Sequence, residues 1–196
     1  MRRGPDKQFD PDEALQKAME LFWAKGYAGT GMAELVRCMG IGKRSLYDTF
    51  GNKRELFRKA IEHYSMTVVR DLHRELKAEG SPLENVRQVL RWLERINATP
   101  GSLGCLLGVS MAQFRTDDAE IAEILRTHML RVENAYYKAF AKAQADGDLK
   151  PATNVRNLAR LFMSAHQGLA LIGRVTETPA VTRGIVDGAL AVLETA

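Results

Sequence analysis

The sequence contains little cysteine. Only two of its 196 residues, Cys38 and Cys105, are cysteines, and they lie far apart in the chain. This excludes a small scaffold held together by disulfide bonds. The four histidines are scattered as well, and no Cys-x₂-Cys or His-x₃-His pair is present. Because zinc sites are commonly built from such pairs, we expect neither a metal nor any other cofactor.

Long apolar runs are also missing. No stretch of about 18 uncharged apolar residues occurs, so we expect no transmembrane helix and no membrane partner. The first eight residues, Met-Arg-Arg-Gly-Pro-Asp-Lys-Gln, lack the apolar segment of a secretory signal. The sequence therefore predicts a cytoplasmic protein.

Motifs that accompany catalysis are absent too. The sequence has no Gly-x-Ser-x-Gly, Walker, dinucleotide-binding or His-Glu-x₂-His motif. It also lacks the Glu-x₂-His pairs from which helical proteins build di-iron sites. We therefore expect no enzyme. A helical module that binds a partner protein or a membrane surface remains an alternative to the function developed below.

What is present is helical periodicity along most of the chain. Apolar residues recur with a period near 3.6, and no segment alternates as a strand would. Asp10-Pro11-Asp12-Glu13 and Ser81-Pro82-Leu83-Glu84 combine a cap residue, a proline and a glutamate, as helix starts do. We predict an all-α fold of about nine helices, with Thr153 as a further start. Their expected ranges are 11–25, 31–39, 43–50, 53–79, 82–97, 103–114, 118–146, 154–172 and 179–194.

Positive charge is concentrated in one region. The net charge is only +4, yet seven Lys and Arg residues and two acidic ones lie between Arg37 and Lys59. There, Gly40-Ile41-Gly42 separates the expected helix 31–39 from the short polar helix 43–50. We expect Gly40 to adopt the left-handed conformation of a tight corner, and Ile41 to fill the gap between the helices. The pattern is equally compatible with a reader of the DNA major groove and with a generic helical hairpin.

The identities of the residues in this region favour a DNA-binding helix-turn-helix over a generic helical hairpin. Leu21-Phe22-x₃-Gly26-Tyr27-x₂-Thr30 is followed by Leu35-x₄-Gly40-Ile41-Gly42-Lys43-x-Ser45-Leu46-Tyr47-x₂-Phe50-x₂-Lys53-x₂-Leu56. This series resembles the signature of the TetR family of bacterial transcriptional regulators over residues 10–64. The resemblance implies a homodimeric repressor that a small molecule releases from a palindromic, double-stranded operator.

The resemblance also implies a domain organisation. A flexible arm at 1–10 would precede a three-helix helix-turn-helix domain at 11–52, which the start of the next helix extends through 53–64. A six-helix ligand-binding and dimerisation domain would occupy 65–196. Because one long helix would run from the first domain into the second, it could relay a displacement between them.

Eight residues near the corner acquire a role from the resemblance. The residues implied to face the groove are Lys43, Arg44, Ser45, Asp48 and Thr49. Those implied to contact phosphate are Tyr47, Lys53 and, at the start of helix 31–39, Thr30.

These roles have a physical basis. Lys43 and Arg44 can donate to guanine O6 and N7, and arginine can do so with two hydrogen bonds. Tyr47 carries a hydroxyl on a rigid ring, and Lys53 lies at a helix N-terminus that already favours an anion. Asp48 could accept from cytosine or repel phosphate, but we favour an i, i+4 pair with Arg44.

Three positions depart from the family pattern. Gly31 stands where the family usually has serine, so one phosphate contact would be missing. Gly42 replaces a common cap residue, and Arg44 replaces a small residue or proline. These departures leave the fold prediction unchanged but prevent any prediction of the operator sequence.

The second half of the chain has helices that are apolar on more than one face, as the lining of a ligand pocket would be. The candidate pocket residues are Trp92, Cys105, Val109, Met111, Phe114, Met129, Tyr136 and His166. Their mixture of aromatic side chains and methionine predicts an apolar or weakly polar effector. Taken singly, each residue is better explained as ordinary core.

Cys105 has a second interpretation. It lies near an expected helix N-terminus, where a thiolate is stabilised. The Gly-Cys-Leu triplet at 104–106 resembles that of a TetR subgroup, some members of which sense electrophiles or oxidants through the cysteine. No Lys, Arg or His lies within five residues of Cys105, which favours the alternative of a small core residue.

The last two expected helices have wide apolar faces. Reading a palindrome requires two helix-turn-helix units about 34 Å apart, so we expect these helices to form an isologous four-helix dimer interface. The candidate interface residues are Leu158, Phe162, Leu169, Val181, Gly184, Ile185, Gly188 and Val192. Packing within one chain is the alternative.

Overall fold

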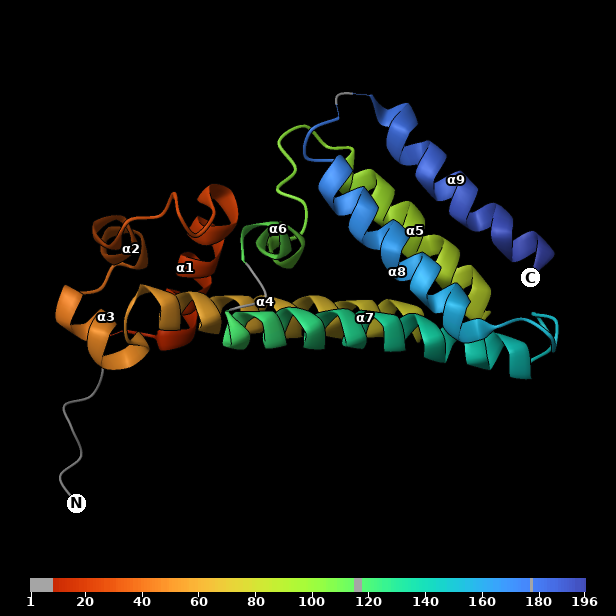
Figure 1. Ribbon diagram of the computed structural model, residues 1–196, viewed down its shortest axis with the longest axis horizontal. Helices are drawn as coiled ribbons and strands as arrows, with labels where there is room; N and C mark the ends of the chain where they lie inside the picture. Colours follow the sequence, from red (N-terminus) through yellow and green to blue (C-terminus); the bar gives the residue numbers. More distant parts are fainter. Residues whose placement is uncertain (1–8, 115–117, 177) are drawn as a thin grey trace, which may run out of the picture. The chain divides into compact units, whose positions relative to one another are not determined.

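A computed structural model describes residues 9–114, 118–176 and 178–196. Over these residues the chain forms nine α-helices and no strand (Figure 1), which confirms the predicted all-α fold. The helices are α1 (Pro11–Lys25), α2 (Met32–Met39), α3 (Lys43–Phe50), α4 (Lys53–Leu76), α5 (Pro82–Asn97), α6 (Leu106–Gln113), α7 (Ala119–Ala145), α8 (Val155–Ile172) and α9 (Pro179–Thr195). Most of the predicted arm at 1–10 lies outside the described residues.

Side-chain caps begin several of these helices. Asp10 accepts a hydrogen bond from the N–H of Asp12 at 2.8 Å, before Pro11 at the first position of α1. The cap of α8 is Asn154, one residue after the predicted Thr153, and it accepts from the N–H of Asn157. The caps supply partners for backbone N–H groups that the first helical turn leaves unbonded.

Two predicted helices are shorter than expected, and the first is the predicted range 53–79, which ends at Leu76 as α4. The predicted range 103–114 becomes α6, which begins at Leu106. Gly101 and Gly104 have φ values of 78° and 65°, which a right-handed helix cannot include. The structure therefore makes Cys105 the cap residue of α6.

The chain divides into two compact units between Tyr64 and Ser65. Helix α4 runs through this boundary without interruption, so its first part belongs to one unit and its remainder to the other. In the first unit, Phe22, Leu46 and Phe57 are almost completely buried. The ring centroids of Phe22 and Phe57 lie 5.0 Å apart in an edge-to-face contact.

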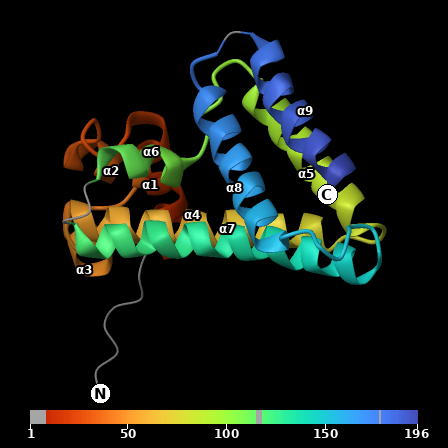
Figure 2. The ribbon, with the colours of Figure 1, turned by 45° about the vertical axis from the view of Figure 1, so that its right-hand side comes forward.

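In the second unit, α5, α8 and α9 lie side by side (Figures 1 and 2) and α7 packs against α5 and α8. Tyr136, Phe140 and Phe162 occupy the centre of the core. The rings of Phe140 and Phe162 meet edge to face at 4.9 Å. In the part of the chain that the structure describes, no helix combines the length and the apolar character that crossing a membrane requires.

Candidate nucleic-acid interface

Helix α3 has one buried side and one exposed side. Leu46 and Phe50 face the core of the first unit, with 0% and 4% of their surface exposed. Six of the eight residues predicted to contact DNA lie elsewhere on this helix. Lys43, Arg44, Tyr47 and Asp48 are exposed, and Ser45 and Thr49 are half-buried. The structure thus brings six predicted residues together on one short helix whose apolar ridge holds it in place.

The corner between α2 and α3 has the predicted geometry. Gly40 is left-handed, with φ 69° and ψ 27°. Its N–H donates to the carbonyl of Arg37, and the N–H of Ile41 donates to that of Val36. Ile41 is buried. The expectations for Gly40 and Ile41 are therefore confirmed, and the corner fixes how α3 leaves α2.

Two lysines in the first turns of α4 contact other parts of the first unit, and one of them contacts α3. The Nζ atom of Lys53 lies 4.4 Å from the centroid of the Tyr27 ring. This cation–π contact restrains a side chain that the sequence assigns to phosphate. Lys59 donates its Nζ to the carbonyl of Thr49 at 3.0 Å, at the C-terminal end of α3. From the sequence, Lys59 was only one member of a basic cluster. In the structure its side chain caps the C-terminal end of α3, the helix predicted to contact DNA bases.

Arg44 and Asp48 form the expected i, i+4 pair, with Nε and Oδ2 3.6 Å apart. Arg44 is 95% exposed and Asp48 is 69% exposed. Because water screens an ion pair at such a surface, the contact stabilises the helix little. The guanidinium can therefore exchange its carboxylate partner for another acceptor at small cost.

The predicted phosphate contact of the Thr30 side chain is contradicted. Thr30 is 1% exposed, and its hydroxyl donates to the carbonyl of Gly26 at 2.7 Å. The cap of α2 is Gly31, which has no side chain to bond the first-turn N–H groups. In that turn, a hydrogen bond from Lys25 lowers the pKa of Glu34.

The predicted pocket residues differ widely in exposure. Trp92 is 47% exposed. Tyr136 and His166 are buried, and the Tyr136 hydroxyl lies 3.2 Å from Nδ1 of His166. Cys105 is buried as well. The half-buried members of the set are Val109, Met111, Phe114 and Met129.

A second buried histidine was missed by the sequence analysis. Nδ1 of His128 lies 3.0 Å from the Ser65 hydroxyl, and burial lowers the pKa of His128 to about 4. Burial, followed by the charge of His128, also lowers the pKa of His166 to about 4. Burial raises the pKa of Tyr136. The sequence could have predicted the burial of His128, because it lies four residues before Val132 and eight before Tyr136, on the same buried face of α7.

The Gly-Cys-Leu triplet has a packing explanation. A Cβ atom on Gly104 would lie 2.0 Å from the carbonyl oxygen of Ala170. The thiol of Cys105, 4% exposed, accepts a hydrogen bond from the N–H of Gly108 at 3.4 Å. Leu106 is buried. Close approach to α8 explains Gly104, capping of α6 fits Cys105, and burial fits Leu106.

The predicted dimer residues separate into two groups. Leu158, Phe162 and Leu169 belong to the core of their own chain, so a place for them between two copies is contradicted. Ile185 is half-buried against that core. The exposed members of the set are Val181, Gly184, Gly188 and Val192. The exposed apolar residues of α8 are instead Leu161, Leu171 and Ile172.

Comparison with known proteins gives two family matches. Residues 14–60 match the family described as bacterial regulatory proteins, tetR family. Residues 82–188 match the family described as tetracyclin repressor-like, C-terminal domain. The first match includes every residue from Thr30 to Lys53 that was assigned to DNA, and the second covers most of the second unit.

Individual relatives match over nearly the full length. YezE of Bacillus subtilis, named as an uncharacterized HTH-type transcriptional regulator, is 31% identical over 195 residues, 97% of this chain and 100% of YezE. The HTH-type transcriptional repressor ComR of Escherichia coli is 31% identical over 88% of this chain and 83% of ComR. A cysteine mutant of the TetR family regulator CifR, solved in complex with 26-bp double-strand operator DNA, is 29% identical. Its TM-score is 0.82, with 96% of this chain and 98% of that chain covered.

Proposed function

The chain belongs to the TetR family of bacterial transcriptional regulators, and from this premise we propose that it is a homodimeric repressor of a palindromic operator. The observation that carries the proposal is the two-sided helix α3. Leu46 and Phe50 anchor it, and a left-handed corner at Gly40 orients it. Lys43, Arg44 and Tyr47 then stand on its exposed side. The relatives ComR and CifR, named as a repressor and as bound to operator DNA, support the same role.

We assign base reading to the exposed face of α3. Lys43 and Arg44 donate to guanine O6 and N7 in the major groove, where arginine can form two hydrogen bonds. Asp48 holds the Arg44 guanidinium until a base replaces it. Ser45 and Thr49, half-buried beside them, contact neighbouring base edges.

We assign phosphate contacts to the groups that flank this face. The Tyr47 hydroxyl and the Lys53 ammonium each bind a phosphate of the backbone. At α2 the first-turn N–H groups beyond Gly31 take the place of the Thr30 side chain, since helix N-termini bind anions. Phosphate contacts of this kind make affinity fall steeply as the salt concentration rises.

The dimer that the proposal needs would form through α8 and α9. Their exposed apolar residues support this, because single-chain packing leaves them in water. They are Leu161, Leu171, Ile172, Val181 and Val192. Gly184 and Gly188 are open positions on α9, where a Cβ atom would meet nothing within 4 Å, and they allow another helix to approach. A two-fold axis through these helices would present two copies of α3 to one palindrome.

Release would follow from a small apolar or electrophilic effector that binds the second unit. Such a ligand shifts the population from a dimer that binds the operator to one that does not. We place the domains of this repressor as the sequence predicted them, with DNA binding in 11–64 and effector binding and dimerisation in 65–196. Cys105 is the candidate target of an electrophile, with its burial as the argument against that role.

Selection of random DNA duplexes on the purified protein at physiological salt tests the proposal. A palindrome with half-sites about one helical turn or a small multiple apart would support base reading and two-fold symmetry together. Loss of enrichment in the Lys43→Ala/Arg44→Ala variant would assign the reading to α3. A folded protein that enriches no sequence would overturn the proposal and favour the partner-binding module.

A further inference from the structure

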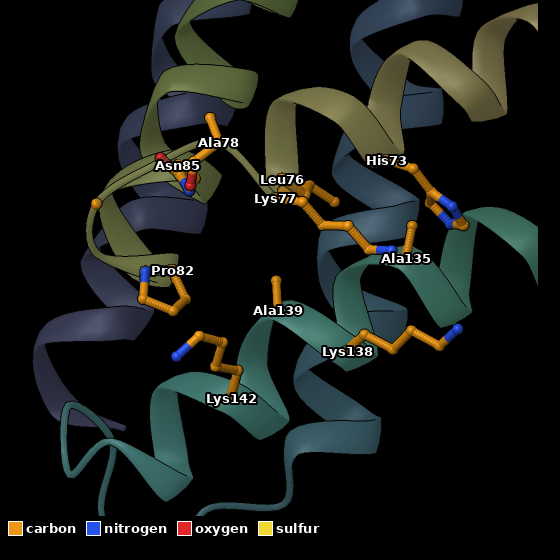
Figure 3. Close-up of a pocket in the computed structure, with 11 residues that line it drawn as sticks. His73, Leu76, Lys77, Ala78, Pro82, Asn85, Ala135, Lys138, Ala139 and Lys142 are labelled. Atoms are coloured by element: carbon orange, nitrogen blue, oxygen red, sulfur yellow. The ribbon is translucent and has the colours of Figure 1, made fainter.

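The second unit contains a cavity that neither the predicted pocket nor the interface includes. It has a volume of about 340 Å³ and lies between the end of α4, the start of α5 and the C-terminal half of α7 (Figure 3). This volume is at the lower end of the range typical of small-molecule sites. Its apolar surface includes Leu76, Pro82, Ala135 and Ala139, all buried side chains.

Three lysines stand around this apolar surface, namely Lys77, Lys138 and Lys142. Lys142 is neutralised by Asp146, whose carboxylate lies 2.6 Å from its Nζ atom. Among the described residues, no carboxylate lies within 4 Å of the other two ammonium groups. In Figure 3 the Lys77 side chain extends from α4 toward Ala135 on α7. Two positive charges therefore border the cavity without an acidic partner.

His73 marks the same side of the cavity. Its Nε2 atom is buried and has no hydrogen-bond partner. Burial, and after it the charges of Lys77 and Lys138, lower the pKa of His73, so its ring is neutral at neutral pH. A buried ring nitrogen without a partner has lost its hydrogen bond to water. A ligand atom in the cavity would restore that bond.

The polar groups on the α5 side are already engaged. The Asn85 amide donates to the carbonyl of Ala78 at 2.8 Å and thereby holds the turn between α4 and α5. The Ser81 hydroxyl donates to Asp148 at 3.3 Å. In the described lining, the two lysines and His73 are the side chains that offer an acidic ligand a positive charge without a carboxylate partner or a buried nitrogen without a hydrogen bond.

We propose that this cavity binds a small organic anion, with the acidic group at His73, Lys77 and Lys138 and the apolar body against Leu76 and Ala139. The apolar lining of the cavity and the positive charge at its border support this ligand class together. An inorganic anion would leave the apolar surface empty. A neutral apolar molecule would leave the buried His73 nitrogen without a partner and gain nothing from the two exposed lysines. The ligand class thus differs from the apolar or electrophilic effector expected from the sequence.

The binding itself does not depend on the proposed function; only its effect on operator release does. The probe is 1-naphthoate, and the matched neutral probe is 1-naphthamide, which has the same rings without the charge. Calorimetry on the full chain without DNA should give a dissociation constant for naphthoate at least about tenfold lower than for the amide. Equal affinities, or no binding of naphthoate, would overturn the proposal.

Substitution then locates the site. Lys77→Met/Lys138→Met keeps the apolar stems and should weaken naphthoate binding about tenfold or more. Lys17→Met/Lys150→Met removes the same charge outside the cavity and should leave binding within about twofold, since distant charges are screened. If both double variants lose affinity for naphthoate equally, the attraction comes from the overall positive charge of the protein, and the assignment of the ligand to this cavity is wrong. Release of a selected operator by naphthoate is measured separately, so failure of repression and failure of binding remain distinguishable.

Discussion

Lowering the pH from 7 to 5 should destabilise the second unit through His128 and His166. Both rings are buried, and burial lowers each pKa from 6.5 to about 4. The unfolded chain therefore binds these protons more readily than the folded one. The stability that depends on the neutral rings is complete above the unfolded pKa. It is lost as the pH falls from about 6.5 toward 4.

The size of the effect follows from linkage. At pH 5 an unfolded histidine with a pKa of 6.5 is almost fully protonated, whereas a folded one with a pKa of about 4 is mostly neutral. One pKa unit corresponds to about 1.4 kcal/mol, so each ring costs about 2 kcal/mol between pH 7 and pH 5. Two rings together cost about 4 kcal/mol, which is most of the stability of a domain at the lower end of the usual range of about 5–15 kcal/mol.

The assay is urea unfolding at pH 7 and pH 5, at one protein concentration and one ionic strength. The chain has two tryptophans, Trp23 in the first unit and Trp92 in the second. In a Trp23→Phe background, the fluorescence of Trp92 reports on the second unit alone. Far-UV circular dichroism checks that the helices unfold in the same transition.

His128→Gln/His166→Gln is the comparison variant. Glutamine keeps a polar partner for the Ser65 and Tyr136 hydroxyls but does not titrate. The variant should lose about 4 kcal/mol less than the parent between the two pH values. Carboxylates that titrate in this range are common to both proteins, so they cancel in the difference. If parent and variant lose equal stability, the reasoning from the buried rings is refuted.

Three further predictions concern DNA reading and local packing. Arg44→Ala should cost about 1–3 kcal/mol of binding free energy at one base pair and relax specificity there, whereas Tyr47→Phe should weaken binding to all duplexes alike. Binding to a panel of operators with single base-pair changes distinguishes the two effects. Gly31→Ser adds a cap where a Cβ atom meets nothing within 4 Å and should tighten operator binding about threefold; unchanged affinity would mean that no phosphate lies near the start of α2. Gly104→Ala forces a Cβ atom against a backbone oxygen of α8 at positive φ and should destabilise the chain by more than about 2 kcal/mol in urea unfolding, whereas Gly168→Ala, at an open position, should not.

The sequence was sufficient for features that neighbouring residues create. The corner at Gly40 needed only a glycine between two amphipathic segments. The division of α3 into an inner ridge, Leu46 and Phe50, and an outer polar side followed from helical spacing. The Arg44–Asp48 pair followed from a separation of four residues. In each case the groups that interact lie within a few positions of one another, so their geometry is that of a single helix or turn.

The tertiary structure decided which apolar or polar group faces which neighbour. Leu158 and Leu161 are both apolar residues of α8, yet only the first lies in the core. Thr30 was expected at a phosphate, but the packing of the first unit leaves only 1% of it exposed. Helical spacing tells which residues share a face but not which neighbour covers that face. That depends on helices brought together from distant parts of the chain.

The second unit makes the same distinction most clearly. The sequence determined that its helices are apolar on wide faces, and therefore that they pack into a bundle. It did not determine that His128 would be buried beside Ser65, 63 residues away, or that Lys77 and Lys138 would border one cavity. Burial and mutual approach set the protonation of a histidine and the charge of a pocket. Both are properties of the packed chain, because they depend on the distances between groups that the sequence keeps far apart.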